Sequence, residues 1–384
     1  MYSRLLKTPL KENQSFFLFG ARGTGKTYWI NSEVKKSLVI DLLEAEISFD
    51  LEANPGRLEK LIPENYEDWV VIDEIQKIPL LLDEVHRLIE KKKIKFILTG
   101  SSARKLKRRG ANLLAGRAIV YNMYPLTVEE LGSNFDLKKS LLYGHLPKIY
   151  DDKKLNPEKY LNSYIKAYLK EEIKHEGFSR NLGAFSRFLE AASFSQGSVL
   201  NINAVSREAG VKQKTVEGYF DLIEDMLVSH RIPVFTKRAK RRLVAHPKFY
   251  FFDVGIFRTL RPKGVFDRKE EIDGIALETL VLQEIIALND YYELDYKIYY
   301  WRTSHGVEVD FILYGPKSLI AIEVKSTRKI HPADLSGLKS FSSEYPQARL
   351  YLLYGGNREE THDGIKVIPI EKALRNLKKI LGST

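Results

Sequence analysis

The sequence predicts a protein of the α/β class that contains more than one domain. Short apolar runs at residues 16–19 (FFLF) and 69–72 (WVVI) have no polar interruption, which is typical of strands buried on both faces of a parallel sheet. Over residues 126–195 apolar side chains recur at three- and four-residue spacing, which is typical of helices. The chain has 384 residues and is long for one domain, so we expect two or three.

A glycine-rich loop follows the first of these strands. Residues 20–27 read GARGTGKT, a complete G-x-x-x-x-G-K-T pattern. A helix that starts at Lys26 would direct backbone N–H groups and a positive helix end at the β- and γ-phosphates of ATP. We expect Lys26 to reach the phosphate oxygens and Thr27 to bind Mg²⁺. The other loop residues predicted to contact the nucleotide are Gly20, Arg22, Gly23, Thr24 and Gly25.

Two further strands are expected to complete this site. The run at 69–72 ends in Asp73 and Glu74, which predicts that Asp73 holds Mg²⁺ through water and that Glu74 polarises the attacking water. Residues 95–100 (KFILTG) predict another strand, whose end would place a hydroxyl where it can sense the γ-phosphate. Thr99 and Ser101 are the two candidates for that hydroxyl.

The phosphate loop, the segment VVIDEIQ at 70–76 and the segment ILTGSS at 97–102 together resemble the AAA-type ATPase module of a large prokaryotic family. The segments at 113–117 (LLAGR) and 124–130 (YPLTVEE) resemble the stretch that follows the last core strands in that family. In ring-forming ATPases of this kind an arginine stabilises transition-state charge, often from a neighbouring subunit. The resemblance implies this role for Arg117, with Arg104 as the second candidate, and it suggests a homo-oligomer.

Composition and charge restrict the classes of function. The chain has no cysteine, which excludes disulfides, thiolate zinc sites and cysteine nucleophiles. It has no uncharged apolar run of membrane-spanning length and no hydrophobic amino-terminal signal, so we expect a soluble cytoplasmic protein without a membrane partner. The formal net charge is +11, with basic clusters at 91–95, 104–109 and 237–242. Such clusters predict a nucleic-acid partner, for which we expect DNA, although solvated charged faces are the alternative.

Residues 201–227 have the rhythm of two helices joined by a turn at Gly210, which is a helix-turn-helix pattern. The second helix would start with Lys212, Gln213, Lys214 and Thr215. In a DNA-binding protein these side chains enter the major groove, while residues 231–242 form a basic β-wing against phosphates. A role as a lid or subunit contact of the ATPase is the alternative.

The last third of the chain carries a second group of chemically active residues. Predicted strands at 307–313 and 319–325 form a hairpin that brings Asp310, Glu323 and Lys325 together. Glu323 and Lys325 share one face because strand side chains alternate. This D-x₁₂-E-x-K arrangement resembles the PD-(D/E)xK nuclease superfamily, although a lone E-x-K is common in exposed strands.

Glu278, in a predicted helix at 274–284, matches the additional acidic residue of that superfamily. The carboxylates of Glu278, Asp310 and Glu323 are hard oxygen ligands that suit Mg²⁺ or Mn²⁺ at a scissile phosphate. Lys325 would orient the attacking water. The segments EVDFIL and IAIEVKS also resemble the carboxyl-terminal domain of the same ATPase family, DUF4143, so the resemblance covers nearly the whole chain.

The expected architecture has four parts. They are a P-loop AAA-type ATPase domain (1–128), a helical lid or connector (129–195), a winged helix-turn-helix (196–245) and a PD-(D/E)xK nuclease-like α/β domain (246–384). The predicted function is ATP-hydrolysing DNA processing, with a Mg²⁺-dependent nuclease-like domain coupled to the ATPase. The alternatives are an ATP-gated DNA-binding or regulatory protein without nuclease activity, and a DNA remodeller such as a translocase.

Overall fold

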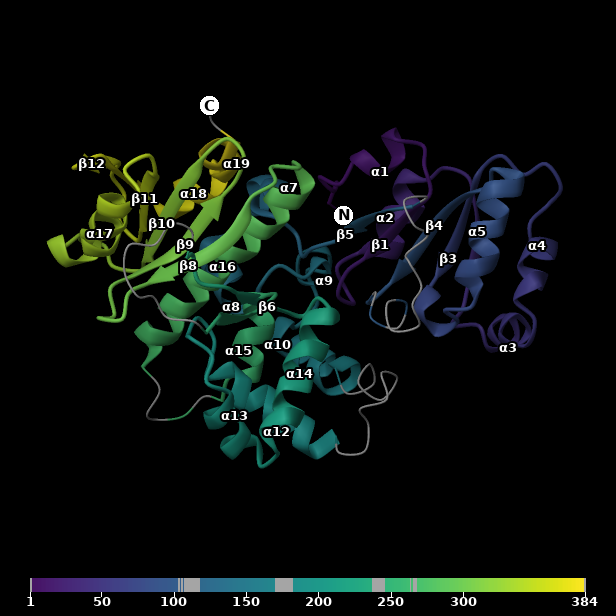
Figure 1. Ribbon diagram of the computed structural model, residues 1–384, viewed down its shortest axis with the longest axis horizontal. Helices are drawn as coiled ribbons and strands as arrows, with labels where there is room; N and C mark the ends of the chain where they lie inside the picture. The colour runs from purple at the N-terminus through teal and green to yellow at the C-terminus, as the bar shows by residue number, and fades with distance from the viewer. Residues whose placement is uncertain are drawn as a thin grey trace. The chain divides into compact units, whose positions relative to one another are not determined.

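The computed structural model describes residues 2–102, 104, 106, 118–169, 182–236, 246–262, 264 and 268–382. These residues fall into two units (Figure 1). The first unit extends to Leu126 and includes Asp225–Val228, and the second contains the other described residues from Thr127 onward. Within these ranges no helix is both long enough and apolar enough to cross a membrane. The four domain limits derived from the sequence stay a prediction.

The first unit is built on a five-stranded parallel sheet in the order β2-β3-β4-β1-β5. Its strands are β1 (Phe16–Phe19), β2 (Ser37–Asp41), β3 (Trp69–Asp73), β4 (Lys95–Gly100) and β5 (Ile119–Asn122). The strands predicted at 16–19, 69–72 and 95–100 are all present, and the α/β class is confirmed. Because β4 lies between β1 and β3, its carboxyl end separates the phosphate loop from Asp73.

Helices surround this sheet because both of its faces are apolar. They are α1 (Thr8–Lys11), α2 (Lys26–Glu33), α3 (Ala45–Ala53), α4 (Leu58–Leu61) and α5 (Leu81–Lys92), with short 3₁₀ turns η1 (Pro55–Arg57) and η2 (Ile75–Lys77). Trp29 of α2 is fully buried and contacts Phe16 of β1 edge-to-face, with ring centroids 6.3 Å apart. On α5, Leu81, Val85 and Leu88 face the core at helical spacing. These contacts pack α2 against β1, the two elements that the phosphate loop connects.

The second unit contains a six-stranded mixed sheet in the order β12-β13-β11-β10-β9-β8. Its strands are β8 (Lys297–Arg302), β9 (Glu308–Tyr314), β10 (Leu319–Lys325), β11 (Arg349–Tyr354), β12 (Glu360–His362) and β13 (Ile365–Pro369). The predicted hairpin of β9 and β10 is present and antiparallel, with Ile322 opposite Phe311 as the last pair before Asp310 and Glu323. The register therefore places those two carboxylates beside each other.

The helices of the second unit include a helix-turn-helix. The turn between α13 (Ile202–Ala209) and α14 (Gln213–Asp225) begins at Gly210. The φ of Gly210 is 64°, in the left-handed region that glycine enters at lower steric cost than any residue with a Cβ. The antiparallel pair β6 (Ser229–Ile232) and β7 (Lys248–Phe251) follows. Residues 237–242 of the predicted basic wing lie outside the described residues, so the winged-helix assignment stays a prediction.

The second unit contains further helices. They are α7 (Val128–Leu131), η3 (Gly132–Asn134), α8 (Leu137–Tyr143), α9 (Pro147–Asp151), α10 (Pro157–Ser163), η4 (Tyr164–Leu169), α12 (Leu182–Ser193), α15 (Val254–Leu260), α16 (Lys269–Tyr291), η6 (Pro332–Leu335), α17 (Ser336–Glu344), α18 (Ile370–Arg375) and α19 (Leu377–Gly382). The longest of them, α16, passes close to β10 and carries Glu278. It thereby brings that acidic residue toward the β9–β10 hairpin.

Candidate functional site

The phosphate loop connects β1 to α2, as predicted. Gly23 and Gly25 have φ values of 79° and 97°, in the left-handed region that glycine enters without steric cost. Gly20 is required for a different reason, since a Cβ at this position would lie 2.4 Å from the carbonyl oxygen of Met123. Backbone conformation therefore favours glycine at positions 23 and 25, and the close approach of the backbone favours it at position 20.

Lys26 is directed into the loop that precedes it. Its Nζ donates to the carbonyl oxygen of Gly20 at 2.6 Å and lies 3.4 Å from that of Ala21. The hydroxyl of Thr24 donates to the same Ala21 oxygen at 2.8 Å and is buried, so this hydroxyl shapes the loop. Lys26 is itself buried, whereas Thr27 is exposed. A phosphate entering the loop would compete with neutral carbonyl oxygens for the Lys26 ammonium, and charge favours the phosphate.

Asp73 is the last residue of β3, and Glu74 follows it at the same edge of the sheet. The hydroxyl of Thr99, which is buried at the end of β4, donates to the Asp73 carboxylate. The backbone N–H of Glu74 donates to Asp73 Oδ1 at 3.1 Å, and Glu74 has a φ of 59°, which is uncommon for a non-glycine residue. The structure therefore holds Asp73 by two neighbouring groups and turns Glu74 sharply away from the strand.

Gln76 is a further polar residue here, to which we assigned no role from the sequence. Its Nε2 donates to the Glu74 carboxylate and to Ser101 Oγ, the latter at 3.2 Å. Gln76 is buried, and its Oε1 has no hydrogen-bond partner among the described residues. Both hydroxyls proposed as γ-phosphate sensors are thus engaged, Thr99 with Asp73 and Ser101 with Gln76. The sequence signal for Gln76 is an amide two residues after Glu74, between Ile75 and Lys77.

The two candidate arginines differ in their accessibility. Arg117 lies outside the described residues. Arg104 is buried, with its Nε 3.4 Å from Asp225 Oδ2 within the first unit. An arginine that reaches the nucleotide of a neighbouring subunit must be exposed, so this burial argues against Arg104 and leaves Arg117 as the candidate.

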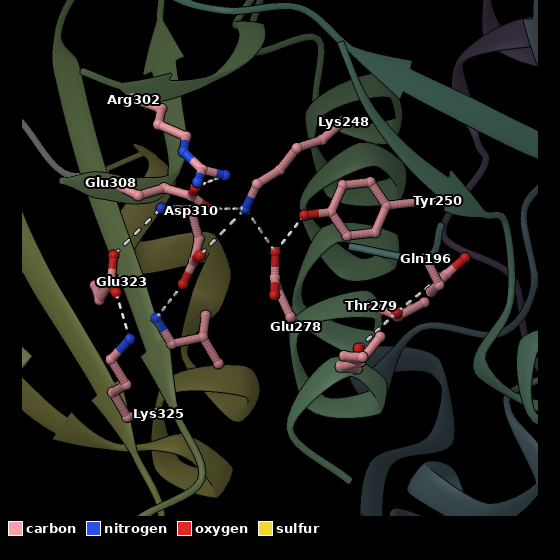
Figure 2. A network of polar contacts seen from close by, with 12 residues as sticks. Gln196, Lys248, Tyr250, Glu278, Thr279, Arg302, Glu308, Asp310, Glu323 and Lys325 are labelled. Carbon is pink, nitrogen blue, oxygen red and sulfur yellow. Dashed lines mark hydrogen bonds and ion pairs between the residues drawn. The ribbon is translucent and has the colours of Figure 1, made fainter. Parts of the chain in front are cut away.

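The second candidate site lies where the pairing of β9 and β10 ends. Asp310 Oδ2 accepts a hydrogen bond from the backbone N–H of Val324 at 2.9 Å, and the N–H of Asp310 donates to Glu323 Oε2 at 3.3 Å. Lys325 Nζ donates to Glu323 Oε1 at 2.6 Å. The three residues that the sequence brings together are therefore in contact (Figure 2).

Lys248, at the start of β7, occupies the space between Glu278 and the hairpin (Figure 2). Its Nζ lies 3.3 Å from Glu278 Oε1 and 3.5 Å from Asp310 Oδ1, and it also forms an ion pair with Glu308. The Lys248 side chain is only 2% exposed. Lys248 was not predicted from the sequence. The available signal was a lysine as the first residue of a strand whose other residues are aromatic, KFYF.

Two aromatic residues complete the surroundings of Lys248. The Tyr250 hydroxyl donates to Glu278, and the Tyr300 ring centroid lies 5.6 Å from the ammonium of Lys248. Burial by itself would lower the pKa of Lys248, but the charge of Glu278 and the neighbouring acidic groups outweighs it and holds this pKa well above its usual range. The ammonium is therefore charged at neutral pH.

Burial also acts on the carboxylates of this centre. It raises the pKa of Glu278, with Lys248 acting in the opposite direction. Burial and the nearby Asp310 raise the pKa of Glu323, while Lys325 acts to lower it. Burial outweighs the lysines, so the pKa of Glu278 rises to about 7 and that of Glu323 to about 8.

The fit of a divalent metal to this centre can be judged from these contacts. Among the described residues no group of three His, Cys, Asp or Glu side chains is arranged to hold a metal ion. Glu278 and Asp310 face Lys248, and Glu323 faces Lys325. The carboxylates have the right chemistry for Mg²⁺ or Mn²⁺, but their arrangement fits lysine cations instead. Metal binding by Glu278, Asp310 and Glu323 stays a prediction.

Another polar network in the second unit has the connectivity of a catalytic triad. His145 Nε2 lies 2.8 Å from Ser140 Oγ, and His145 Nδ1 lies 3.4 Å from Glu284 Oε1. All three residues are at most 1% exposed, so a substrate has no access to the serine. Glu284 accepts from the N–H of Val128 at the start of α7, and Asp253 accepts from the N–H of His145 at 2.7 Å. This network joins helices and is structural.

Comparison with protein families assigns three segments of the chain. Residues 12–132 match the family described as an AAA domain, and residues 273–373 match a domain of unknown function, DUF4143. Residues 134–267, which include the helix-turn-helix, match a domain of unknown function, DUF8612. The first two matches confirm the resemblance drawn from the sequence motifs.

Relatives of similar length carry comparable sequences. The chain is 24% identical over 381 residues to uncharacterized proteins of Mycobacterium tuberculosis and Mycobacterium bovis, which covers 96% of this chain and 83% of each relative. An uncharacterized protein of Haemophilus influenzae is 22% identical over 330 residues, which covers 81% of this chain and 78% of the relative. A crystal structure of a Vibrio cholerae protein aligns over 95% of this chain and 96% of its own, with 13% identity and a TM-score of 0.24.

Proposed function

We propose that this chain, in which an AAA domain precedes a DUF4143 region, binds and hydrolyses ATP and uses this reaction to act on DNA. The observation that carries the ATPase part is a convergence of groups at one edge of the parallel sheet. The phosphate loop follows β1, Thr99 lies near the end of β4, and Asp73 ends β3 with Glu74 directly after it. This is the set of groups that phosphoryl transfer to water requires.

Each group has a distinct role in the proposal. ATP bound with Mg²⁺ supplies the γ-phosphoryl group that is transferred to water. Lys26 would hold phosphate oxygens, and Thr27 and Asp73 would hold the magnesium ion. Glu74 orients and polarises the attacking water. The backbone of the remaining loop residues, namely Gly20, Arg22, Gly23, Thr24 and Gly25, would contact the phosphates, and Arg117 would contribute positive charge from a neighbouring copy in a homo-oligomer.

The DNA part of the proposal rests on charge and on the exposed end of α14. The net charge is +11, and Lys212 and the first three residues of α14 are all exposed, namely Gln213, Lys214 and Thr215. The order α13, α14, β6, β7 supports a winged helix in which α14 enters the major groove. Binding of this kind weakens as salt rises.

The carboxyl-terminal domain has two candidate roles, each favoured by one observation. The pairing of Lys248 with Glu278 and Asp310 favours a domain that grips or remodels DNA without cutting it. The contact of Asp310, Glu323 and Lys325 favours a PD-(D/E)xK-like nuclease that uses Mg²⁺ or Mn²⁺. We favour the first role, because the described residues form no three-ligand group that holds a metal ion.

One experiment separates these roles. Phosphate release and DNA cleavage are measured with labelled single-stranded, duplex and branched DNA, with and without Mg²⁺ or Mn²⁺. We expect DNA to stimulate phosphate release, Lys26→Ala and Glu74→Gln to abolish it, and no DNA to be cut. Metal-dependent cleavage that disappears in Glu323→Ala would establish the nuclease, and phosphate release that persists in Lys26→Ala would overturn the ATPase assignment.

A further inference from the structure

We propose that Lys248 is the resident cation of the carboxylate centre formed by Glu278, Glu308 and Asp310, and that it excludes divalent metal ions from this centre. The inference concerns metal binding at the second unit alone. Metal exclusion by Lys248 depends neither on ATP hydrolysis nor on DNA binding. It can therefore fail while the proposed function holds, and the proposed function can fail while it holds.

Lys248 occupies the position that a bound metal ion would take. The three carboxylates come from α16 and β9, and the ammonium of Lys248 lies within ion-pair distance of all of them, at 3.3 Å from Glu278 and 3.5 Å from Asp310. A divalent ion bound by these oxygens would occupy the same space. Two cations a few ångströms apart in a buried site repel strongly, because little water screens them.

The described contacts hold Lys248 in place. Its strand β7 pairs with β6 on one side, and the backbone of Lys248 also bridges to Val199. The side chain is 2% exposed, and its ammonium faces the ring of Tyr300. Tyr250, from the same strand, donates to Glu278. Withdrawal of the ammonium would leave three acidic groups close together without their shared counter-ion, which is unfavourable in a buried site.

The neighbouring charges are already balanced. Arg302 lies 3.2 Å from Glu308 Oε2, and Lys325 lies 2.6 Å from Glu323 Oε1. The oxygen donors that a metal would need therefore have cationic partners supplied by the chain. While they face Lys248, Glu278, Glu308 and Asp310 form no metal-binding group within the described part of the chain. Without the lysine, these hard oxygen ligands would turn toward Mn²⁺ or Mg²⁺ as their shared cation. The centre would then become a metal site.

The test measures Mn²⁺ binding without nucleotide in a Lys26→Ala parent, so that the phosphate loop does not contribute. Bound Mn²⁺ is followed by electron paramagnetic resonance of the free ion, and the thermal midpoint is recorded with and without Mn²⁺. We expect no bound ion in the parent and one per chain in Lys248→Met, with a midpoint that rises with Mn²⁺. Addition of Asp310→Asn should remove this binding.

Two control variants separate charge from packing. Lys248→Arg keeps a cation in the centre, and Lys317→Met removes an exposed lysine elsewhere in the second unit. Both should behave as the parent does. Binding of Mn²⁺ by the parent that Asp310→Asn abolishes would overturn the proposal, and so would a folded Lys248→Met protein that binds no Mn²⁺. If Lys248→Met unfolds without metal, recovery of its near-ultraviolet circular dichroism in Mn²⁺ supports the proposal, and failure to recover overturns it.

Discussion

Gln76 Nε2 lies 3.2 Å from Ser101 Oγ and also donates to Glu74, so one buried amide links the end of β4 to the proposed water-polarising carboxylate. The hydrogen bond from Gln76 restrains the orientation of the Glu74 carboxylate. A change at the end of β4 would therefore reach Glu74 through this amide. Gln76 acts in this scheme as a positioning residue, since it is not proposed to contact the nucleotide.

Gln76→Ala should lower kcat for ATP hydrolysis by about 10- to 100-fold, because Glu74 would lose the partner that orients it. KM for ATP should change little, since the phosphate loop is untouched. Steady-state phosphate release over a range of ATP concentrations measures both quantities. The matched control is Gln347→Ala, at an exposed glutamine of the second unit. A raised KM with an unchanged kcat would contradict the positioning role.

Gly20→Ala should destabilise the first unit by about 1–3 kcal/mol, the usual range for forcing extra atoms into a packed site. The added Cβ would lie 2.4 Å from the backbone oxygen of Met123, and a backbone atom cannot move aside as a flexible side chain can. Urea unfolding of the two proteins measures the difference. Gly382→Ala is the control, because a Cβ there meets nothing within 4 Å. Equal stability of the two variants would show that the loop tolerates the added Cβ.

Acid should destabilise the second unit partly through His230 on β6. Burial lowers the pKa of His230 to about 4, whereas the unfolded chain takes up the proton near pH 6.5. The stabilisation is therefore complete above about pH 6.5 and is lost as the pH falls from there toward about 4. Between about pH 7 and pH 5 the free energy of unfolding should fall by about 1–2 kcal/mol more for the wild type than for His230→Phe.

Urea unfolding at several pH values, followed for the second unit, measures this difference. His230 is only partly buried, so the lower end of the range is expected. Identical pH profiles for wild type and His230→Phe would mean that the histidine titrates equally in the folded and unfolded chains.

The double variant Lys212→Ala/Lys214→Ala should weaken DNA binding and reduce its salt dependence. Each lysine that contacts a phosphate releases about one counter-ion, so the slope of log K against log salt should fall by about 1–2. Fluorescence anisotropy with duplex DNA at several salt concentrations measures this slope. Lys153→Ala/Lys154→Ala removes the same charge from another exposed segment and is the control. An equal loss in both double variants would indicate a general charge effect and would remove α14 from the DNA interface.

Local pattern allowed the sequence to predict much of the first unit. Buried parallel strands are continuous apolar runs, and a phosphate loop needs glycine at fixed spacing, so both are legible without knowledge of distant contacts. The hairpin that carries Asp310 and Glu323 was predictable for the same reason, since its strands are adjacent in the chain and their register follows from alternation. The helix-turn-helix was legible from periodicity and from Gly210.

What the tertiary structure decided is which distant groups share a buried charge. Lys248 meets Glu278 and Asp310, residues 30 and 62 positions away, and no periodicity relates them. Gln76 likewise meets Ser101 only because β4 lies beside β3 in the sheet. Sequence motifs were enough to identify the phosphate loop and the Asp310, Glu323 and Lys325 group, because binding phosphate or a metal restricts the residue types that can serve. The packing of strands and helices determined their partners, because a buried charge is stable only beside whatever counter-charge the fold brings to it.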